Sequence, residues 1–214
     1  MEIINLGVGG ATSEEILRDQ LPKAIEFNPD LVILLSGTND LLYSKKLTSI
    51  ERWQKATESM LKELTSRKIQ VILLSIPPCN EEYLFLRHKK ECYSNPDVNG
   101  QICLANTILS NLATQYHAYI VDLHKLVLSY GPVGEEKSLL RNMKNSNLHD
   151  GVHLTKIGYD KLADLIVETM NLLFIDGQRI ACIGDSLTAG ADMVGFGTAT
   201  GDTYPGRLKE KLGY

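Results

Sequence analysis

The stretch "RIACIGDSLTAG", Arg179 to Gly190, joins a short apolar run to a Gly-Asp-Ser-Leu turn. The run is typical of a buried strand, and the turn would display Ser186 just beyond the strand's carboxyl end. A serine displayed there could be a nucleophile, or Asp185 and Ser186 could simply cap the following helix. Few residues follow Ser186, so any catalytic partners must come from earlier in the chain.

Four other apolar runs resemble that strand, and none alternates apolar with polar residues. Near-continuous hydrophobicity is what parallel strands require when helices cover both faces of their sheet. Helical patterns separate the runs, so the sequence predicts an α/β fold: a three-layer, flavodoxin-like sandwich around a five-stranded parallel sheet. The five predicted strands are 2–6, 30–36, 69–76, 118–123 and 179–184.

The predicted helices show apolar residues at spacings of three and four, which place them on one face. Thr155 is a suitable N-cap for one of them. Another helix should begin at Ser13, with Pro22 kinking or dividing it. The predicted helical segments are 13–27, 51–64, 98–115, 156–173 and 203–212.

Length and composition are those of a globular domain. The chain has 214 residues, of which 43% are hydrophobic and 22% charged, and its net charge is -4. Without a basic excess we expect no nucleic-acid partner. No apolar run approaches the roughly 20 residues of a membrane span, so we expect no stable membrane anchor. The start "MEIINLGVGG" lacks the features of a signal peptide, which weakly favours a cytoplasmic location.

The four cysteines, at positions 79, 92, 103 and 182, do not follow a zinc-ligand spacing. Cys182 lies within an apolar strand and should be a buried small residue. The other three lie in or just after the segment 79–100, which we interpret as a surface insertion that could border a cleft. A disulfide among them is possible but has no support in the sequence.

Chemically capable residues follow three of the predicted strands and precede one helix. In an open α/β sheet, ligands bind beyond the carboxyl ends of the strands. Gly10 lies in "GVGGAT" after the first strand, Asn39 in "GTND" after the second, and Ser186 follows the fifth. Asp150 and His153 lie in "HDGVHLT", before the helix 156–173.

Each of these turns also has a plain structural interpretation. Asn39 could form an Asx-turn, "GVGGAT" could be a tight turn, and Asp150 with His153 could be a polar helix start. "GVGGAT" is not a dinucleotide fingerprint. Together, however, the turns supply a nucleophile, a base, a group to orient the base and oxyanion donors. The three-residue spacing can set the carboxylate of Asp150 beside Nδ1 of His153, leaving Nε2 to face a serine.

The four segments resemble the conserved blocks of the SGNH (GDSL) hydrolase family of serine esterases and lipases. "GDSLT" resembles the serine block, "NLGVGGAT" the glycine block, "GTND" the asparagine block and "DGVHLT" the histidine block. The resemblance covers nearly the whole chain, which we expect to be one domain, 1–214. It implies hydrolysis of a small-molecule ester, with the oxyanion held by the backbone N–H groups of Ser186 and Gly10 and the side-chain amide of Asn39. No metal or organic cofactor is expected.

The order of the blocks departs from the family, whose members usually begin with the serine block. Joining the end of this chain to its beginning and cutting before Arg179 restores the usual order. We therefore expect a circular permutation with its junction near 174–179, where Asp176 and Gly177 would form a turn. The last strand, 179–184, should then lie inside the sheet, giving the strand order 1-5-2-3-4.

Two other functions are compatible with the same fold. One is a catalytically silent ligand-binding or scaffold domain, and the other is a nucleotide-binding flavodoxin-like domain. Intact candidates for every catalytic role argue against the first, and the missing phosphate-binding fingerprint argues against the second.

The remaining polar residues receive structural roles. Asp185 should form the turn, His149 should be solvated or support the site from behind, and His88 should be structural. Tyr204 should pack in the core, although it could line the acyl pocket. Substrate choice should depend on 79–100, 131–148 and 188–203, and the segment 131–148 could be mobile.

Overall fold

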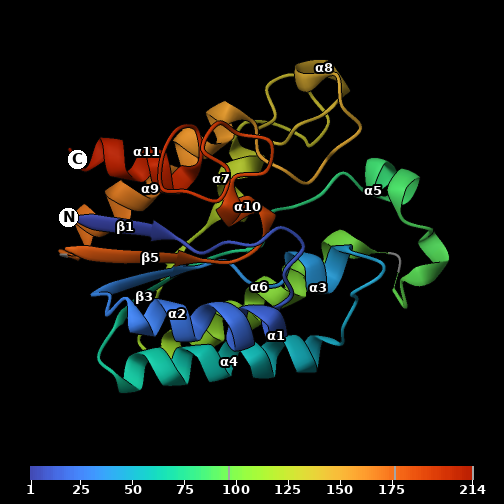
Figure 1. Cartoon of the computed structure of the whole chain (residues 1–214). Helices are drawn as coiled ribbons and strands as arrows, with labels where there is room; N and C mark the ends of the chain where they lie inside the picture. Colours follow the sequence, from blue (N-terminus) through green and yellow to red (C-terminus); the bar gives the residue numbers. More distant parts are fainter. Residues whose placement is uncertain (96, 176, 214) are drawn as a thin grey trace.

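The fold is an open, five-stranded parallel sheet between two layers of helices (Figure 1). A computed structural model describes residues 1–95, 97–175 and 177–213. The strand order is β1-β5-β2-β3-β4, as the sequence predicts. The strands are shorter than predicted: β1 (Glu2–Asn5), β2 (Leu31–Leu34), β3 (Gln70–Leu74), β4 (Tyr119–Val121) and β5 (Arg179–Ile183).

The strand β5, although last in the sequence, lies inside the sheet. Ile180 is opposite Ile3 of β1 on one side and opposite Leu31 of β2 on the other. Residues Ile180 to Ile183 are fully buried, which explains why their run is apolar throughout. The turn after β5 therefore lies between the turns that follow β1 and β2.

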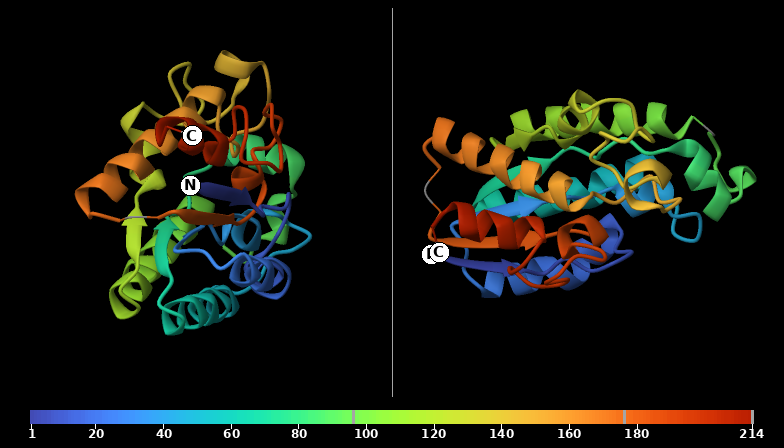
Figure 2. Two further views of the ribbon diagram at one scale, coloured as in Figure 1. Left: turned by 60° about the vertical axis from the view of Figure 1, so that its left-hand side comes forward. Right: turned by 90° about the horizontal axis from the view of Figure 1, so that it is seen from above.

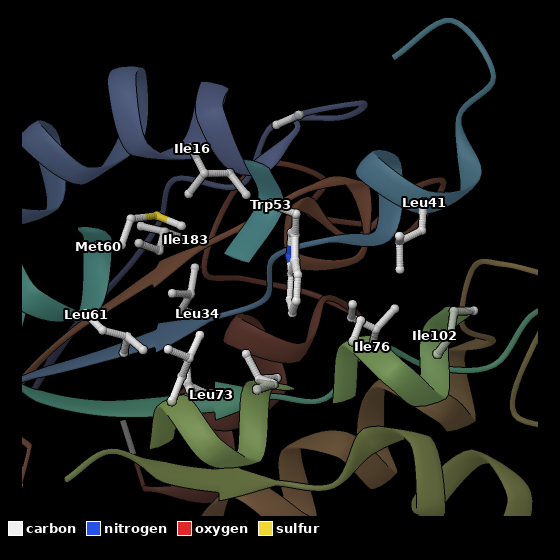
Figure 3. Packing of buried hydrophobic residues seen from close by; sticks show 14 of the residues in the cluster. Ile16, Leu34, Leu41, Trp53, Met60, Leu61, Leu73, Ile76, Ile102 and Ile183 are labelled. Atoms are coloured by element: carbon white, nitrogen blue, oxygen red, sulfur yellow. The ribbon is translucent and has the colours of Figure 1, made fainter. Parts of the chain in front are cut away.

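One face of the sheet is covered by the helices of the first half of the chain, which Figure 2 shows from two further directions. Val32 and Leu34 of β2 point into this layer, where Trp53 and Met60 pack (Figure 3). The helices on this side are α1 (Ser13–Glu15), the π-helix η1 (Ile16–Gln20), α2 (Leu21–Glu26), α3 (Thr38–Leu42), α4 (Ile50–Ser66) and α6 (Val98–Gln115). The short helix α5 (Glu81–Arg87) lies beyond the carboxyl ends of the strands (Figure 1).

The opposite face is covered mainly by helices of the second half. Leu31 and Ile33 of β2 point into this layer, so the strand alternates between two cores. The helices that contribute to this second core are α7 (Leu123–Ser129), α9 (Lys156–Leu172), α10 (Ser186–Ala189) and α11 (Tyr204–Lys211). Two short elements lie in connecting segments: the 3₁₀-helix η2 (Lys90–Cys92) and α8 (Met143–Ser146).

Capping residues in the sequence predicted where several helices begin. Thr155 caps α9 by accepting a hydrogen bond from the N–H of Gly158, as predicted. The cap of α1 is Thr12, one residue before the predicted start, in a capping box with Glu15. The expected break near Pro22 is a change of helix type, because the π-helical turn ends at Gln20 and α2 begins at Leu21.

The predicted permutation junction lies in the connection between α9 and β5. Its Asp176 falls outside the described residues, so the predicted Asp-Gly turn is not tested. The two ends of the ribbon lie side by side at the amino-terminal edge of β1 (Figures 1 and 2). Met1 and Leu212 both pack against the second core.

The segment 79–100 contains α5, η2 and the start of α6, and it packs through the buried Leu84 and Tyr93. All four cysteines are free; Cys79 and Cys182 are buried, whereas Cys92 and Cys103 are exposed. Within the described ranges, no helix has the length and apolar content needed to cross a membrane.

Candidate active site

Ser186 is held at the start of α10 by a constrained turn. A Cβ on Gly184 would lie 2.7 Å from the carbonyl oxygen of Leu35, so only glycine fits there. The buried amide of Gln20 donates to the carbonyl of Gly184 and accepts from its N–H, both at 2.8 Å. Asp185 then caps α10 by accepting from the N–H of Leu187 at 2.8 Å. These contacts fix the direction of the Ser186 side chain.

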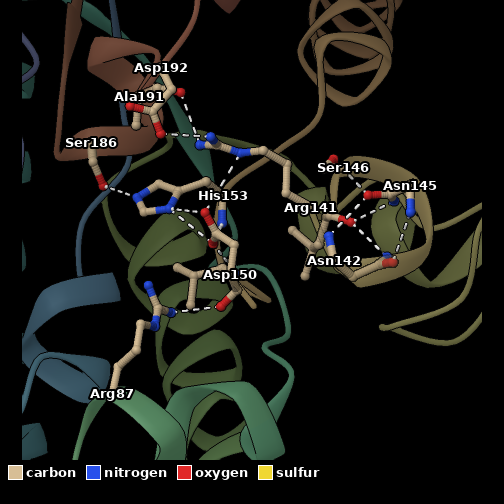
Figure 4. Close-up of polar contacts among 12 residues, drawn as sticks. Arg87, Arg141, Asn142, Asn145, Ser146, Asp150, His153, Ser186, Ala191 and Asp192 are labelled. Carbon is tan, nitrogen blue, oxygen red and sulfur yellow. Dashed lines mark hydrogen bonds and ion pairs between the residues drawn. The ribbon is translucent and has the colours of Figure 1, made fainter. Parts of the chain in front are cut away.

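The structure brings Ser186, His153 and Asp150 together as one hydrogen-bonded chain (Figure 4). Oγ of Ser186 lies 3.0 Å from Nε2 of His153. Nδ1 of His153 lies 2.9 and 3.0 Å from the two carboxylate oxygens of Asp150. The imidazole therefore has a carboxylate on one side and a hydroxyl on the other, which is the arrangement that nucleophilic catalysis by serine requires.

Asp150 belongs to a tight turn that also presents His153. One carboxylate oxygen, Oδ1, accepts from the backbone N–H groups of Val152 and His153 at 3.0 and 2.9 Å. Burial acts to raise the pKa of Asp150, but the hydrogen bonds and charge of His153 outweigh it and hold the pKa well below its usual range. The carboxylate is therefore charged at neutral pH and can stabilise an imidazolium.

Arg141 connects the Asp150 turn to the loop after the serine helix. Its side chain is buried, and Nε lies 3.7 Å from Oδ2 of Asp150. Nη1 forms an ion pair of 2.7 Å with Asp192, and Nη2 donates to the carbonyl of Ala191 at 2.9 Å (Figure 4). Its backbone N–H donates to the carbonyl of His153 at 2.8 Å. One residue thus braces both halves of the site.

The three predicted oxyanion donors line a common cleft in front of Ser186. Within the described parts of the chain, the backbone N–H groups of Gly10 and Ser186 donate to no other group. Nδ2 of Asn39 donates one hydrogen to the carbonyl of Ala11 at 2.9 Å. That bond fixes the amide plane and leaves the second N–H for a ligand.

The cleft has a volume of about 530 Å³, the size of a small-molecule site. Leu42, Leu84 and Val152 give it an apolar wall, and Arg87 and His88 of the 79–100 segment also line it. The expectation that this segment could border a cleft is confirmed. The structural role assigned to His88 was incomplete, because its ring lies in the lining.

The other polar residues behave largely as predicted. Asp185 forms the turn; burial raises its pKa to about 6, although the hydrogen bond from Leu187 opposes the rise. Tyr204 is fully buried and packs in the second core. His149 packs edge-on against the ring of Tyr83, with centroids 4.8 Å apart. In the described ranges, no group of three or more His, Cys, Asp or Glu side chains is arranged to hold a metal ion.

The sequence model of the GDSL-like lipase/acylhydrolase family matches residues 1–161. The chain belongs to this family. The match includes Gly10, Asn39, Asp150 and His153. It ends before Ser186, but in the folded chain Ser186 lies within hydrogen-bonding distance of His153. The chain is therefore a hydrolase of ester bonds. A comparison with curated protein sequences found no match to this chain.

Solved structures of several bacterial proteins share its architecture. A candidate acylhydrolase from Bacteroides fragilis is 25% identical, with a TM-score of 0.60 over 78% of this chain and 73% of that one. A GDSL-like lipase from Bacteroides thetaiotaomicron is 24% identical, with a TM-score of 0.58 over 77% and 73% of the two chains. An acetyl xylan esterase, AlAXEase, is 23% identical, with a TM-score of 0.60 over 76% and 78%.

Proposed function

We propose that the enzyme is a serine esterase that cleaves carboxylic esters through an acyl-enzyme, with Ser186 as nucleophile, His153 as base and Asp150 as its orienting carboxylate. The observation that carries this proposal is the hydrogen-bonded chain from Ser186 through His153 to Asp150. A scaffold domain without catalytic activity would have no need to hold three buried or half-buried polar side chains in one hydrogen-bonded chain.

In the proposed reaction, Ser186 Oγ attacks the ester carbonyl carbon while Nε2 of His153 accepts the hydroxyl proton. Asp150 stabilises the imidazolium that forms. The N–H groups of Ser186 and Gly10 and Nδ2 of Asn39 hold the oxyanion. The tetrahedral intermediate then expels the alcohol, which takes the proton from His153. A water molecule then attacks the acyl carbon of the acyl-enzyme while His153 accepts its proton. The second tetrahedral intermediate releases the carboxylic acid, and Oγ of Ser186 takes the proton back from His153.

The substrate class that the cleft favours is an ester with a small acyl or aryl group. Leu42, Leu84 and Val152 form the apolar wall, and the cleft volume of about 530 Å³ suits a compact ligand. An acetyl xylan esterase shares the fold, so acetylated sugars belong beside short-chain acyl, aryl and thioester substrates and lysophospholipids in any survey of activity.

We also propose that residues 1–214 form one circularly permuted domain with its junction near 174–179. Its support is the central position of β5 and the closeness of the chain ends. The proposal requires that Ser186 be activated by the earlier residue His153 within one chain. Complementation of a Ser186→Ala chain by a His153→Ala chain, restoring activity when the two are mixed, would contradict it.

The direct test is hydrolysis of 4-nitrophenyl esters of increasing chain length, together with acetylated sugars. The wild-type enzyme should hydrolyse at least one, and Ser186→Ala should lower kcat by roughly 10³- to 10⁶-fold. A thermal denaturation curve of the variant that matches the wild type would show that the fold is intact. Unchanged hydrolysis by Ser186→Ala would exclude Ser186 as the nucleophile.

A further inference from the structure

The cleft in front of Ser186 is electrostatically unlike the rest of the molecule. The chain carries a net charge of -4, yet none of the described residues that line the cleft is an aspartate or a glutamate. Its charged lining residues are Lys46 and Arg87, and His88 and His153 lie beside them. The lining is therefore positive in a protein that is negative overall, a distribution that attracts anionic ligands.

The two cations differ in whether a carboxylate neutralises them. Nζ of Lys46 lies 2.7 and 2.8 Å from the carboxylate oxygens of Glu15, and it also donates to the carbonyl of Gly10 at 3.0 Å. Glu15 itself is fixed by the capping box of α1. Lys46 thus supports the turn that carries Gly10, and its charge is already compensated.

Arg87 has no such partner. Nη2 donates to the backbone carbonyl of Asp150 at 2.7 Å, and no carboxylate within the described residues forms an ion pair with its guanidinium. Figure 4 shows Arg87 and Arg141 approaching Asp150 from different directions. The single bond holds the exposed guanidinium of Arg87 beside the catalytic turn and leaves most of its five N–H donors available.

His88, the next residue, lies beside Arg87 in the cleft lining. Its Nδ1 lies 2.9 Å from Oγ of Ser44, which fixes the ring in the cleft wall. Burial lowers the pKa of His88, and the charges of Arg87 and Lys45 lower it further. An anion bound at Arg87 would oppose both charge effects.

We propose that the natural substrates are esters that carry a carboxylate or phosphate group, and that Arg87 binds this anion while Ser186 acts on the ester. A guanidinium matches the geometry of either anion through paired N–H donors. A short carbon chain between ester and anion would contact Leu42, Leu84 and Val152 of the same cleft. This inference rests on the proposed esterase function and names its substrate class.

The test compares kcat/KM for matched pairs of an anionic and a neutral ester. One pair is mono-4-nitrophenyl glutarate and 4-nitrophenyl pentanoate, with the anion on the acyl side. A second pair, 4-acetoxybenzoate and its methyl ester, places the carboxylate on the alcohol side. A third pair, 4-acetoxyphenyl phosphate and 4-acetoxyanisole, replaces the carboxylate by phosphate.

We expect the wild-type enzyme to prefer the anionic member of at least one pair, and we expect Arg87→Gln to lower that anionic-to-neutral ratio roughly 10- to 100-fold, as for a lost charge-assisted hydrogen bond. Arg87→Lys should retain part of the preference. The matched control is Lys89→Gln, which removes one charge from the same exposed segment outside the cleft lining and should leave the ratio unchanged.

A second measurement separates this inference from the esterase proposal. Calorimetric titration of monomethyl glutarate into Ser186→Ala should show binding that is lost when Arg87→Gln is added. Neutral esters hydrolysed as fast as anionic ones in all three pairs would overturn the anionic substrate class, and a preference that survives Arg87→Gln would overturn the role of Arg87; neither result would touch the esterase proposal. Binding of monomethyl glutarate with no hydrolysis of any ester would overturn the esterase proposal instead.

Discussion

The two sides of the His153 ring differ in how completely their polar groups are paired. Behind Nδ1, Asp150 and Arg141 are buried, and their side chains are bound to one another and to neighbouring loops. In front of Nε2, Gly10, Ser186 and Asn39 line an open cleft, and the N–H groups of Gly10 and Ser186 and one N–H of Asn39 have no acceptor among the residues that the structure describes.

The difference indicates that the two sides of the ring have different roles. Fixed contacts on the back set the position of the imidazole before a substrate arrives. Unpaired donors on the front keep their hydrogen-bonding capacity for charge that develops during the reaction. The two arginines differ in the same way: the buried Arg141 is held by Asp192 and the carbonyl of Ala191, whereas the exposed Arg87 donates, among the described residues, only to the carbonyl of Asp150.

The substitution Asn39→Ala tests the unpaired donors on the Nε2 side of His153 and should have the largest effect. It removes one of the proposed oxyanion donors, so kcat should fall by roughly 10²- to 10³-fold with a much smaller change in KM. Steady-state kinetics on the best 4-nitrophenyl ester would measure this, with thermal denaturation as the check on folding. Retained kcat would mean that Asn39 only anchors its turn through the carbonyl of Ala11.

The contacts behind Nδ1 of His153 are tested by Arg141→Gln. We expect kcat/KM to fall by roughly 10- to 100-fold, because the variant loses the side chain that connects Asp150 to the 191–192 loop. Removal of the cation also leaves Asp150 a stronger partner for the imidazolium. The kinetic pKa of the base in the pH profile of kcat/KM should therefore be higher in the variant than in the wild type.

Arg141→Lys provides the matched control, because it keeps the charge and loses the planar fork. It should lower kcat/KM without moving the kinetic pKa. A loss of activity in Arg141→Gln with an unmoved kinetic pKa would reduce Arg141 to a purely structural residue. Equal pKa shifts in both variants would also contradict the proposed electrostatic effect.

The smallest effect on catalysis, and a clear one on stability, is expected for Asp185→Asn. Burial raises the folded-state pKa of Asp185 to about 6, against 3.8 for an ordinary aspartate. The folded state therefore holds a proton that the unfolded state releases, and stability is lost as pH rises through 6. Asparagine keeps the cap on Leu187 without the buried charge.

The free energy of unfolding of Asp185→Asn, relative to the wild type, should thus increase by about 2–3 kcal/mol between pH 4 and pH 7. Urea titrations of both proteins across this range would measure the difference, and the charged neighbours Asp40 and His153 are present in both. A difference that stays flat, or that falls with pH, would contradict the assigned cause.

Much of the fold could be predicted from the sequence because its signals are local. Continuous apolar runs marked all five strands, and the order of the family blocks placed β5 inside the sheet. The turns after β1, β2 and β5 meet because the carboxyl ends of parallel strands lie at one edge. The α9 cap at Thr155 depends on a contact only three residues away.

The bracing contacts could not be predicted, because they join residues that are far apart in the chain. Gln20 clamps Gly184 from a π-helix, and Arg87 reaches Asp150 from the 79–100 segment. For Arg141 the sequence contains one weak sign of burial, because the arginine directly follows Leu139 and Leu140. Which long polar side chain meets which turn depends on packing, and no periodicity in a single sequence records it.

The central claim, that Ser186 is the nucleophile and that its partners precede it in the chain, is tested most directly by covalent labelling. Phenylmethylsulfonyl fluoride should add one sulfonyl group per chain, and peptide mass mapping should place it on Ser186. His153→Ala should react far more slowly. An adduct on any other residue, or ester hydrolysis that continues with Ser186 fully modified, would contradict the claim.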